Sequence, residues 1–298
     1  MPHPVLHVCL ALEALDRWRS DPACAPFPVD APGVENHMLH GALAPDMGFF
    51  PGCDGRLSQL FHTGGSSSMA RTLLALSQSP RDLAFTWGWI SHVLADVEIH
   101  PHINAAAVDL LHAEGQRSPS HGARRQAHVR VEAGVDAWYF ASASRLRRTR
   151  LAHAFDARGI ELPSRAFSIT YDATFPCRRL LSFHRNVTIH YNAYLRLAAL
   201  IAAEFEAGVR RPLRLSHVRA IATRVLDRRS TAFGFLEPVA PAEPLLARVH
   251  TAIAQFHARL SRLASNGIDD LMDYNLETGA IAQGSELRVP VMALPVGS

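Results

Sequence analysis

The sequence contains no lysine. All 30 basic residues of the 298-residue chain are arginines, and 27 acidic residues leave a formal net charge of +3. Without lysine the chain can form neither a lysine Schiff base nor the lysine contact of a P-loop, so both kinds of chemistry are excluded. The small positive excess is only a weak indication of binding to nucleic acid or to an anionic membrane.

Long apolar runs and paired cysteines are also missing. No run of 18 apolar residues occurs and the mean hydropathy is +0.02, so we expect no transmembrane helix. The four cysteines form no CxxC pair, and a chain of this length does not need disulfides, so we expect reduced thiols. The segment Met1–Trp18 has neither the basic stretch nor the cleavage site of a signal peptide. Together these features predict a cytoplasmic protein.

Alternating strand patterns are scarce, and only Arg165–Tyr171 fits a strand. Helical periodicity dominates instead, and it predicts helices over Leu6–Trp18, His37–Leu43, Ser67–Leu76, Pro80–Val97, Ala105–His112, Gly122–Arg148, Arg178–Val209, Ser216–Arg228 and Pro244–Ala264. Pro101 should end or kink the helix before it, and Asp270–Asn275 should add one helical turn. We therefore predict one all-α, multi-helix domain over residues 1–276 and an extended tail over residues 277–298.

Histidine is unusually frequent, with 17 residues. Two predicted helices each place a histidine four residues before a carboxylate: His92 before Asp96, and His128 before Glu132. This spacing puts both side chains on one helix face, where they can bind one metal ion. One such pair alone is usually a solvated ion pair. The helix around His92 is otherwise apolar, however, so its polar pair must be hydrogen-bonded or coordinated.

Further candidates lie outside these two pairs. Asp46 follows a proline in an apolar, glycine-bearing loop, and His62 precedes two glycines that would let the backbone pass close to a site. His100 and His102 flank Pro101. His7 lies in the first predicted helix, where it fits a buried core histidine and a ligand about equally well. His37, His40, His184 and His190 are better explained as ordinary core or surface residues.

The order His7, Asp46, His62, His92-x3-Asp96, a later histidine and His128-x3-Glu132 resembles the zinc-dependent phospholipase C family, whose fold is shared with the P1/S1 nucleases. The resemblance covers about residues 1–140. It implies an all-α fold and a cluster of zinc ions. The first ion would be held by Asp46, His62, His92 and Asp96. The second would be held by the histidine after Asp96 with His128 and Glu132, and the third by His7 with Asp96 as a bridge.

Two features depart from the family pattern. Secreted members use a mature N-terminal tryptophan as a ligand of the third ion, but Trp18 is not terminal here, so the cluster would hold two or three zinc ions. Secreted members also place the later histidine six residues after the aspartate, which selects His102. A His-Pro step four residues on, which selects His100, resembles intracellular relatives. We favour His100 slightly and keep both as candidate ligands.

The resemblance implies a zinc-dependent phosphoester hydrolase that cleaves a phospholipid or a related phosphodiester and contacts a membrane surface transiently. Asp46, as ligand and base, is the catalytic candidate. One alternative is a P1-like nuclease or nucleotidase, which base-stacking aromatics such as Phe49, Phe50 or Trp138 would favour; only this alternative implies a nucleic-acid partner. A zinc-binding protein without turnover is the other alternative. The arginine run Arg145, Arg147, Arg148 and Arg150 is either a solvated face or a dock for an anionic headgroup.

Overall fold

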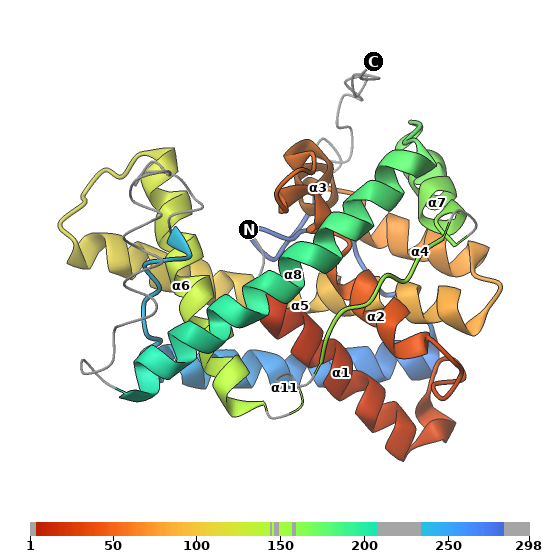
Figure 1. Cartoon of the computed structure of the whole chain (residues 1–298), viewed down its shortest axis with the longest axis horizontal. Coiled ribbons are helices and arrows are strands. Elements are labelled where there is room, and N and C mark those ends of the chain that lie inside the picture. The colour runs from red at the N-terminus through yellow and green to blue at the C-terminus, as the bar shows by residue number, and fades with distance from the viewer. Residues whose placement is uncertain (1–3, 144, 146–148, 157–158, 208–233, 283–298) are drawn as a thin grey trace.

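The computed structural model describes residues 4–143, 145, 149–156, 159–207 and 234–282 (Figure 1). Helices dominate them, and the prediction of an all-α fold is confirmed. The helices are α1 (Pro4–Ser20), α2 (Val34–Leu43), α3 (Gly55–Thr63), α4 (Ser66–Leu76), α5 (Pro80–Ala113), α6 (His121–Ser142), α7 (Glu161–Tyr171), α8 (Cys177–Ala207) and α11 (Glu243–Asn266). Short 3₁₀ turns cover η1 (Pro22–Cys24) and η2 (Met47–Phe49). Strands β1 (Tyr274–Asn275) and β2 (Ala280–Ile281) form an antiparallel hairpin.

Helix α5 is the central element, because α1, α2, α4, α6 and α11 all pack against it. Its first half is buried almost completely, including the large side chain of Trp89. The Trp89 ring packs edge-on against Phe61 of α3 at a centroid distance of 4.9 Å, and its indole N–H donates to the carbonyl oxygen of Ser66 at 2.9 Å. In Figure 1, α8 runs diagonally across the view and α11 lies along its lower side.

Helices α2 and α5 approach each other closely because each carries a glycine at the crossing. A Cβ atom at Gly41 would overlap the carbonyl oxygen of Phe85, and one at Gly88 would overlap that of Met38. The two backbones are therefore closer than any other residue at these positions would allow. The sequence analysis did not single out either glycine.

The start of α5 agrees with the sequence, but its end does not. Ser79 caps the helix in a capping box with Asp82, and Pro80 follows at the first position. The expected end at Pro101 is wrong: α5 continues through Pro101 to Ala113 as one helix with the segment predicted separately over Ala105–His112. Its apolar face goes on beyond the proline, where Ile103 and Leu111 are buried, and this burial outweighs the lost backbone hydrogen bond.

Two local predictions differ from the structure, and one helix was missed. The strand expected over Arg165–Tyr171 is wrong, because this segment lies in α7, which buries Pro163, Ala166 and Phe167 at helical spacing. The helical turn expected over Asp270–Asn275 is also wrong, since the segment holds turns and strand β1. Helix α3 was not predicted. The helix predicted over Ser216–Arg228 lies outside the described residues.

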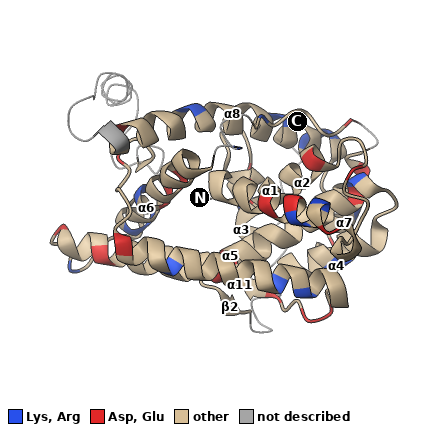
Figure 2. Cartoon of the chain, turned by 90° about the horizontal axis from the view of Figure 1, so that it is seen from below, with Lys and Arg blue, Asp and Glu red and all other residues tan. Residues whose placement is uncertain are grey.

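The predicted tail begins within the hairpin, so its first residues are a turn and strand β2. The division of the chain at residue 276 remains a prediction. Among the described residues, no helix is long and apolar enough to cross a membrane. All four cysteines are free thiols. Acidic and basic positions lie close together on α1 in Figure 2.

Candidate metal centre

The predicted ligands come together in one buried cluster, with the exception of His102. His7 comes from α1, Asp46 from the residue before η2, and His62 from α3. Helix α5 supplies His92, Asp96 and His100, and α6 supplies His128 and Glu132. All are buried except His128, which is partly exposed.

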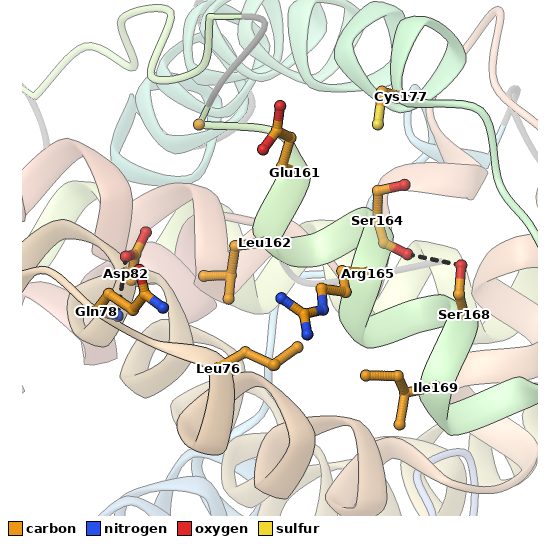
Figure 3. A pocket seen from close by; sticks show the side chains of 11 residues that line it. Leu76, Gln78, Asp82, Glu161, Leu162, Ser164, Arg165, Ser168, Ile169 and Cys177 are labelled. Carbon is orange, nitrogen blue, oxygen red and sulfur yellow. Dashed lines mark hydrogen bonds between the residues drawn. The ribbon is translucent and has the colours of Figure 1, made fainter.

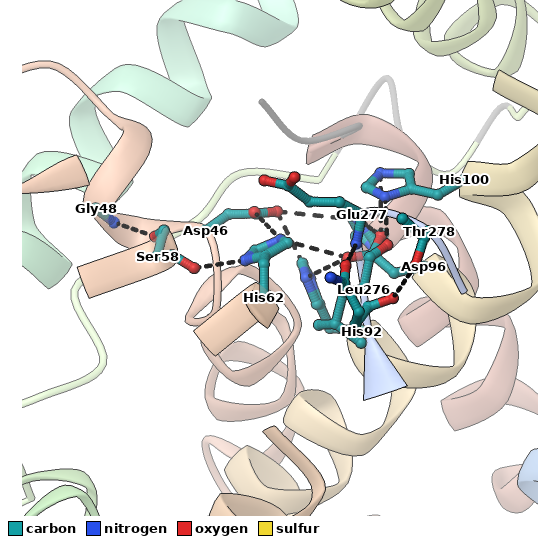
Figure 4. Close-up of polar contacts among 12 residues, drawn as sticks. Asp46, Gly48, Ser58, His62, His92, Asp96, His100, Leu276, Glu277 and Thr278 are labelled. Atoms are coloured by element: carbon teal, nitrogen blue, oxygen red, sulfur yellow. Dashed lines mark hydrogen bonds and ion pairs between the residues drawn. The ribbon is translucent and has the colours of Figure 1, made fainter. Parts of the chain in front are cut away.

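Asp96 lies at the centre of the cluster (Figure 4). Its Oδ1 lies 3.1 Å from Nε2 of His7 and 3.4 Å from Nε2 of His100. Its Oδ2 lies 3.0 Å from Nε2 of His92 and 3.4 Å from Nε2 of His62. One carboxylate thus faces four imidazoles on its two oxygens.

The ligand atoms form three groups, each with all its donor atoms within 4.8 Å of one another. These groups are Asp46 with His62 and His92, then His100 with His128 and Glu132, and finally His7 with His92 and Asp96. The family resemblance implies similar sets, except that it adds Asp96 to the first group and leaves His92 out of the third. The assignment of individual ligands to individual ions remains a proposal.

Four of the histidines are held in the same way, through Nδ1. The acceptors are the carbonyl oxygen of Ser58 for His62 (2.7 Å), that of Ala42 for His92 (2.8 Å), that of Leu276 for His100 (2.7 Å), and Oδ1 of Asn104 for His128 (2.9 Å). A carbonyl oxygen can only accept, so Nδ1 carries a proton in each ring, and the lone pair of Nε2 is free to bind a metal whenever Nε2 is not itself protonated. This is the tautomer with which histidine binds a metal through Nε2.

The cluster leaves several buried polar atoms without a hydrogen bond. Among the described residues, both carboxylate oxygens of Asp46, Nε2 of His7 and His92, and Oδ2 of Asp96 have no hydrogen-bond partner. Such atoms are costly to bury unless something else binds them. A cation among them would remove this cost, and a set of imidazole and carboxylate donors suits zinc. The residues present therefore fit the zinc ions that the sequence predicts.

The electrostatics of the cluster keep its two aspartates ionised. Burial opposes ionisation, but the neighbouring His92 and His62 hold the pKa of Asp46 below its usual value. The pKa of Asp96 is held well below its usual value in the same way, against burial, chiefly by His100 and His92. Both groups are therefore available as anionic ligands at neutral pH.

The histidines divide into two sets. Burial opposes protonation in His7, His62, His100 and His128. In His62 the contacts with Asp46 and Asp96 outweigh burial and raise the pKa to about 10. In His100, Asp96 and Glu132 raise the pKa to about 9. In His7 and His128 burial prevails and lowers the pKa.

His102 belongs to none of the three ligand groups. It lies on α5 only two residues after His100, and at about 100° per residue its side chain points to nearly the opposite side of the helix. The structure thus favours His100 over His102 as the ligand. The sequence left this choice open because it predicted that the helix would be interrupted at Pro101.

Two supporting residues escaped the sequence analysis. Asp136 is buried, and its carboxylate accepts hydrogen bonds from the backbone N–H groups of Val5 (3.3 Å) and Leu6 (3.0 Å), at the first turn of the helix that carries His7. Asp136 follows Glu132 by four residues, so the sequence spacing could have predicted that both lie on the same face of α6. Asn104, which binds His128, follows His100 by four residues and was readable in the same way.

The other predicted functional residues lie in varied places. The Phe49 ring is partly exposed and lies 5.4 Å from that of His62, at the edge of the cluster. Phe50 is buried, and Trp138 packs against Tyr139 and His250. Arg145 forms ion pairs with carboxylates, those of Asp16 and Glu35. Arg147 and Arg148 lie outside the described residues.

A separate hollow of about 510 Å³ lies where α4, α5 and α7 meet (Figure 3). Arg165, Ser164 and Ser168 line it, and none of the candidate ligands does. It therefore adds nothing to the metal centre.

The all-α fold and the buried histidine–carboxylate cluster define a helical protein built to bind metal ions. A family model described as zinc-dependent phospholipase C matches residues 7–198. The chain belongs to this family. Neither a curated protein nor a solved structure matches it. Membership supports a hydrolase that uses zinc and acts on a phospholipid.

Proposed function

We propose that this protein is a zinc-dependent phosphodiester hydrolase of the phospholipase C type, acting on a phospholipid or a related phosphodiester. The observation that carries the proposal is the convergence of His7, His62, His92 and His100 on the buried carboxylate of Asp96. The cluster would hold two or three zinc ions. When bound, they would stabilise negative charge on the phosphoryl oxygens and lower the pKa of a water molecule.

The chain's own residues have distinct roles in this proposal. Asp96 would lie between bound cations, and its negative charge would offset their mutual repulsion. Asp46 is the base candidate, because it is ionised at neutral pH and buried within the cluster. Its Oδ1 lies 3.1 Å from Nε2 of His62, which orients the carboxylate. Asp46 can therefore accept a proton from the attacking water.

The structure also gives one reason to keep the nuclease alternative. Phe49 is partly exposed beside His62, where an aromatic ring could stack on a nucleobase. A lipid substrate would instead require transient contact with a membrane surface. The cytoplasmic location expected from the sequence remains a prediction.

The test is an activity screen of the zinc-loaded chain on phosphatidylcholine vesicles, single-stranded DNA and an aryl phosphodiester. We expect hydrolysis of the vesicles and of the aryl ester, lost on chelation and restored by zinc. Asp46→Asn should lose activity by about a hundredfold or more, since it removes general-base catalysis. His102→Gln is the matched control and should keep it. Cleavage of DNA alone would favour the nuclease. A zinc-loaded chain that cleaves none of the three would favour a binding protein without turnover.

A further inference from the structure

The β1–β2 hairpin lies against α5 at Pro101, the proline in the interior of that helix. A Cβ atom at Gly279 would lie 2.8 Å from the carbonyl oxygen of Val97 and 2.9 Å from Cγ of Pro101. Pro101 has no N–H, so the Val97 carbonyl lacks the helical donor it would otherwise have four residues on. Gly279 also has a φ of +71°, which disfavours any side chain. Close contact here thus depends on glycine.

From this position the hairpin turn reaches two of the candidate ligands through one residue. The carbonyl oxygen of Leu276 accepts the hydrogen bond from Nδ1 of His100 at 2.7 Å. The N–H of Leu276 donates to the backbone carbonyl of His62 at 2.8 Å. Leu276 itself is fully buried, so these bonds are shielded from competing water (Figure 4).

The next residue reaches a third ligand through Asn104. The side-chain N–H of Asn104 donates to the carbonyl oxygen of Glu277 at 2.6 Å, and Oδ1 of Asn104 lies 2.9 Å from Nδ1 of His128. The two polar atoms of the Asn104 side chain therefore have separate roles: Nδ2 binds the hairpin and Oδ1 binds His128. Both imidazoles of the group formed by His100, His128 and Glu132 depend on the hairpin for their orientation.

We propose that the β1–β2 hairpin is the positioning element of the metal site formed by His100, His128 and Glu132, with Asn104 and Gly279 as its positioning residues. The hairpin lies outside residues 7–198, which the family model matches. The inference rests on the proposed zinc centre. Its physical content is that the Leu276 carbonyl and Asn104 fix the rings so that each presents Nε2 to the same ion.

The experiment compares zinc binding by Asn104→Ala and Gly279→Ala in the full chain. Loss of an outer partner of a ligating histidine typically weakens metal binding by about 10- to 100-fold. In both variants we expect one zinc ion to bind more weakly by this factor, while the remaining zinc binds as in the wild-type chain. Chelator competition measures affinity and stoichiometry. The visible spectrum of the Co²⁺-substituted protein reports the coordination of the affected ion, which a merely structural role would leave unchanged.

Gly115→Ala is the matched control, because Gly115 has a φ of +76° and its Cβ would meet no atom within 4 Å. It carries the same backbone strain without a clash and should bind zinc normally. Asn104→Ala provides the test if Gly279→Ala does not fold. Residue 104 lies within α5, and alanine is a good helix former, so we expect this variant to fold. Asn104→Asp keeps an acceptor for His128 and loses the donor to Glu277. We therefore expect this variant to bind zinc more tightly than Asn104→Ala does.

Wild-type affinity and an unchanged Co²⁺ spectrum in folded Asn104→Ala would overturn the positioning role while leaving the zinc centre intact. A wild-type chain that binds no zinc would overturn the centre itself, and this inference with it.

Discussion

His92 donates its Nδ1–H to the carbonyl oxygen of Ala42, 50 residues earlier in the chain, at 2.8 Å. The bond joins α5 to α2 and turns Nε2 of His92 toward the cluster. It is possible only because Gly41 and Gly88 let the two helices approach closely. The orientation of His92 thus depends on the close packing of α2 against α5.

Gly88→Ala should therefore affect both stability and metal binding. Its methyl group would overlap the Met38 carbonyl and lie 2.8 Å from the Ala42 nitrogen, so the helices must separate. We expect a loss of about 1–3 kcal/mol in the free energy of unfolding, and weaker zinc binding. Gly122→Ala in α6 is the control: its Cβ would meet nothing closer than 3.9 Å, and it should stabilise the helix slightly. Denaturant titration and chelator competition give the two values. Equal stability of both variants would contradict the prediction.

Asp96 faces four imidazoles, whereas Glu132 contacts the ligand group at its own end of the cluster. Asp96→Asn should accordingly lose at least two zinc ions together, and Glu132→Gln about one. Elemental analysis of the purified variants, with circular dichroism to confirm folding, checks the difference. Full metal content in Asp96→Asn would rule out a bridging role.

His100→Ala and His102→Ala test the choice between neighbouring histidines. His100 is buried with Nε2 at 3.4 Å from Asp96 and 3.6 Å from Glu132, while His102 points away. We expect His100→Ala to lose one zinc ion and most of the phosphodiesterase activity, and His102→Ala to resemble the wild type. The opposite result would restore the spacing of the secreted enzymes. Equal, mild effects would mean that the second site uses other ligands.

His40 predicts how stability depends on pH. Burial, opposed by its bond to the Ala152 carbonyl, lowers its pKa to about 4. The unfolded chain, with a histidine pKa of about 6.5, takes up a proton that the folded chain does not, so His40 destabilises the fold as pH falls below 6.5. Between pH 6.5 and pH 4, the free energy of unfolding should fall by about 3 kcal/mol because of His40. Above pH 6.5 His40 should have no effect.

The measurement is denaturant unfolding between pH 4 and 7 in EDTA, because loss of zinc at low pH would otherwise dominate. His40→Gln keeps a donor for Ala152 but cannot titrate, so its stability should fall less steeply with acid. Replacing an exposed histidine, as in His121→Gln, should leave the wild-type slope. Parallel curves for the wild type and His40→Gln would refute the prediction.

Helical periodicity was a reliable guide where a helix buries one face against the core. It correctly predicted the start of α5 at Pro80 and the body of α8, since both depend on local sequence. It failed at Pro101, where a local helix-breaking signal competed with burial on both sides of the proline. It failed again at Arg165–Tyr171, because a short run of mixed residues has no clear period.

The candidate ligands were readable because metal chemistry restricts residue type, and because a spacing of four residues fixes a shared helix face. Their mutual distances could not be read, since they depend on how α1, α3, α5 and α6 cross. The sequence alone thus determined the all-α class, the absence of lysine chemistry and the ordered set of histidines and carboxylates. Only the tertiary structure placed His100, and not His102, beside Asp96 and Glu132, and brought the Leu276 carbonyl to His100. The reason is physical: the 176 residues that separate Leu276 from His100 are bridged by packing, which no local pattern encodes.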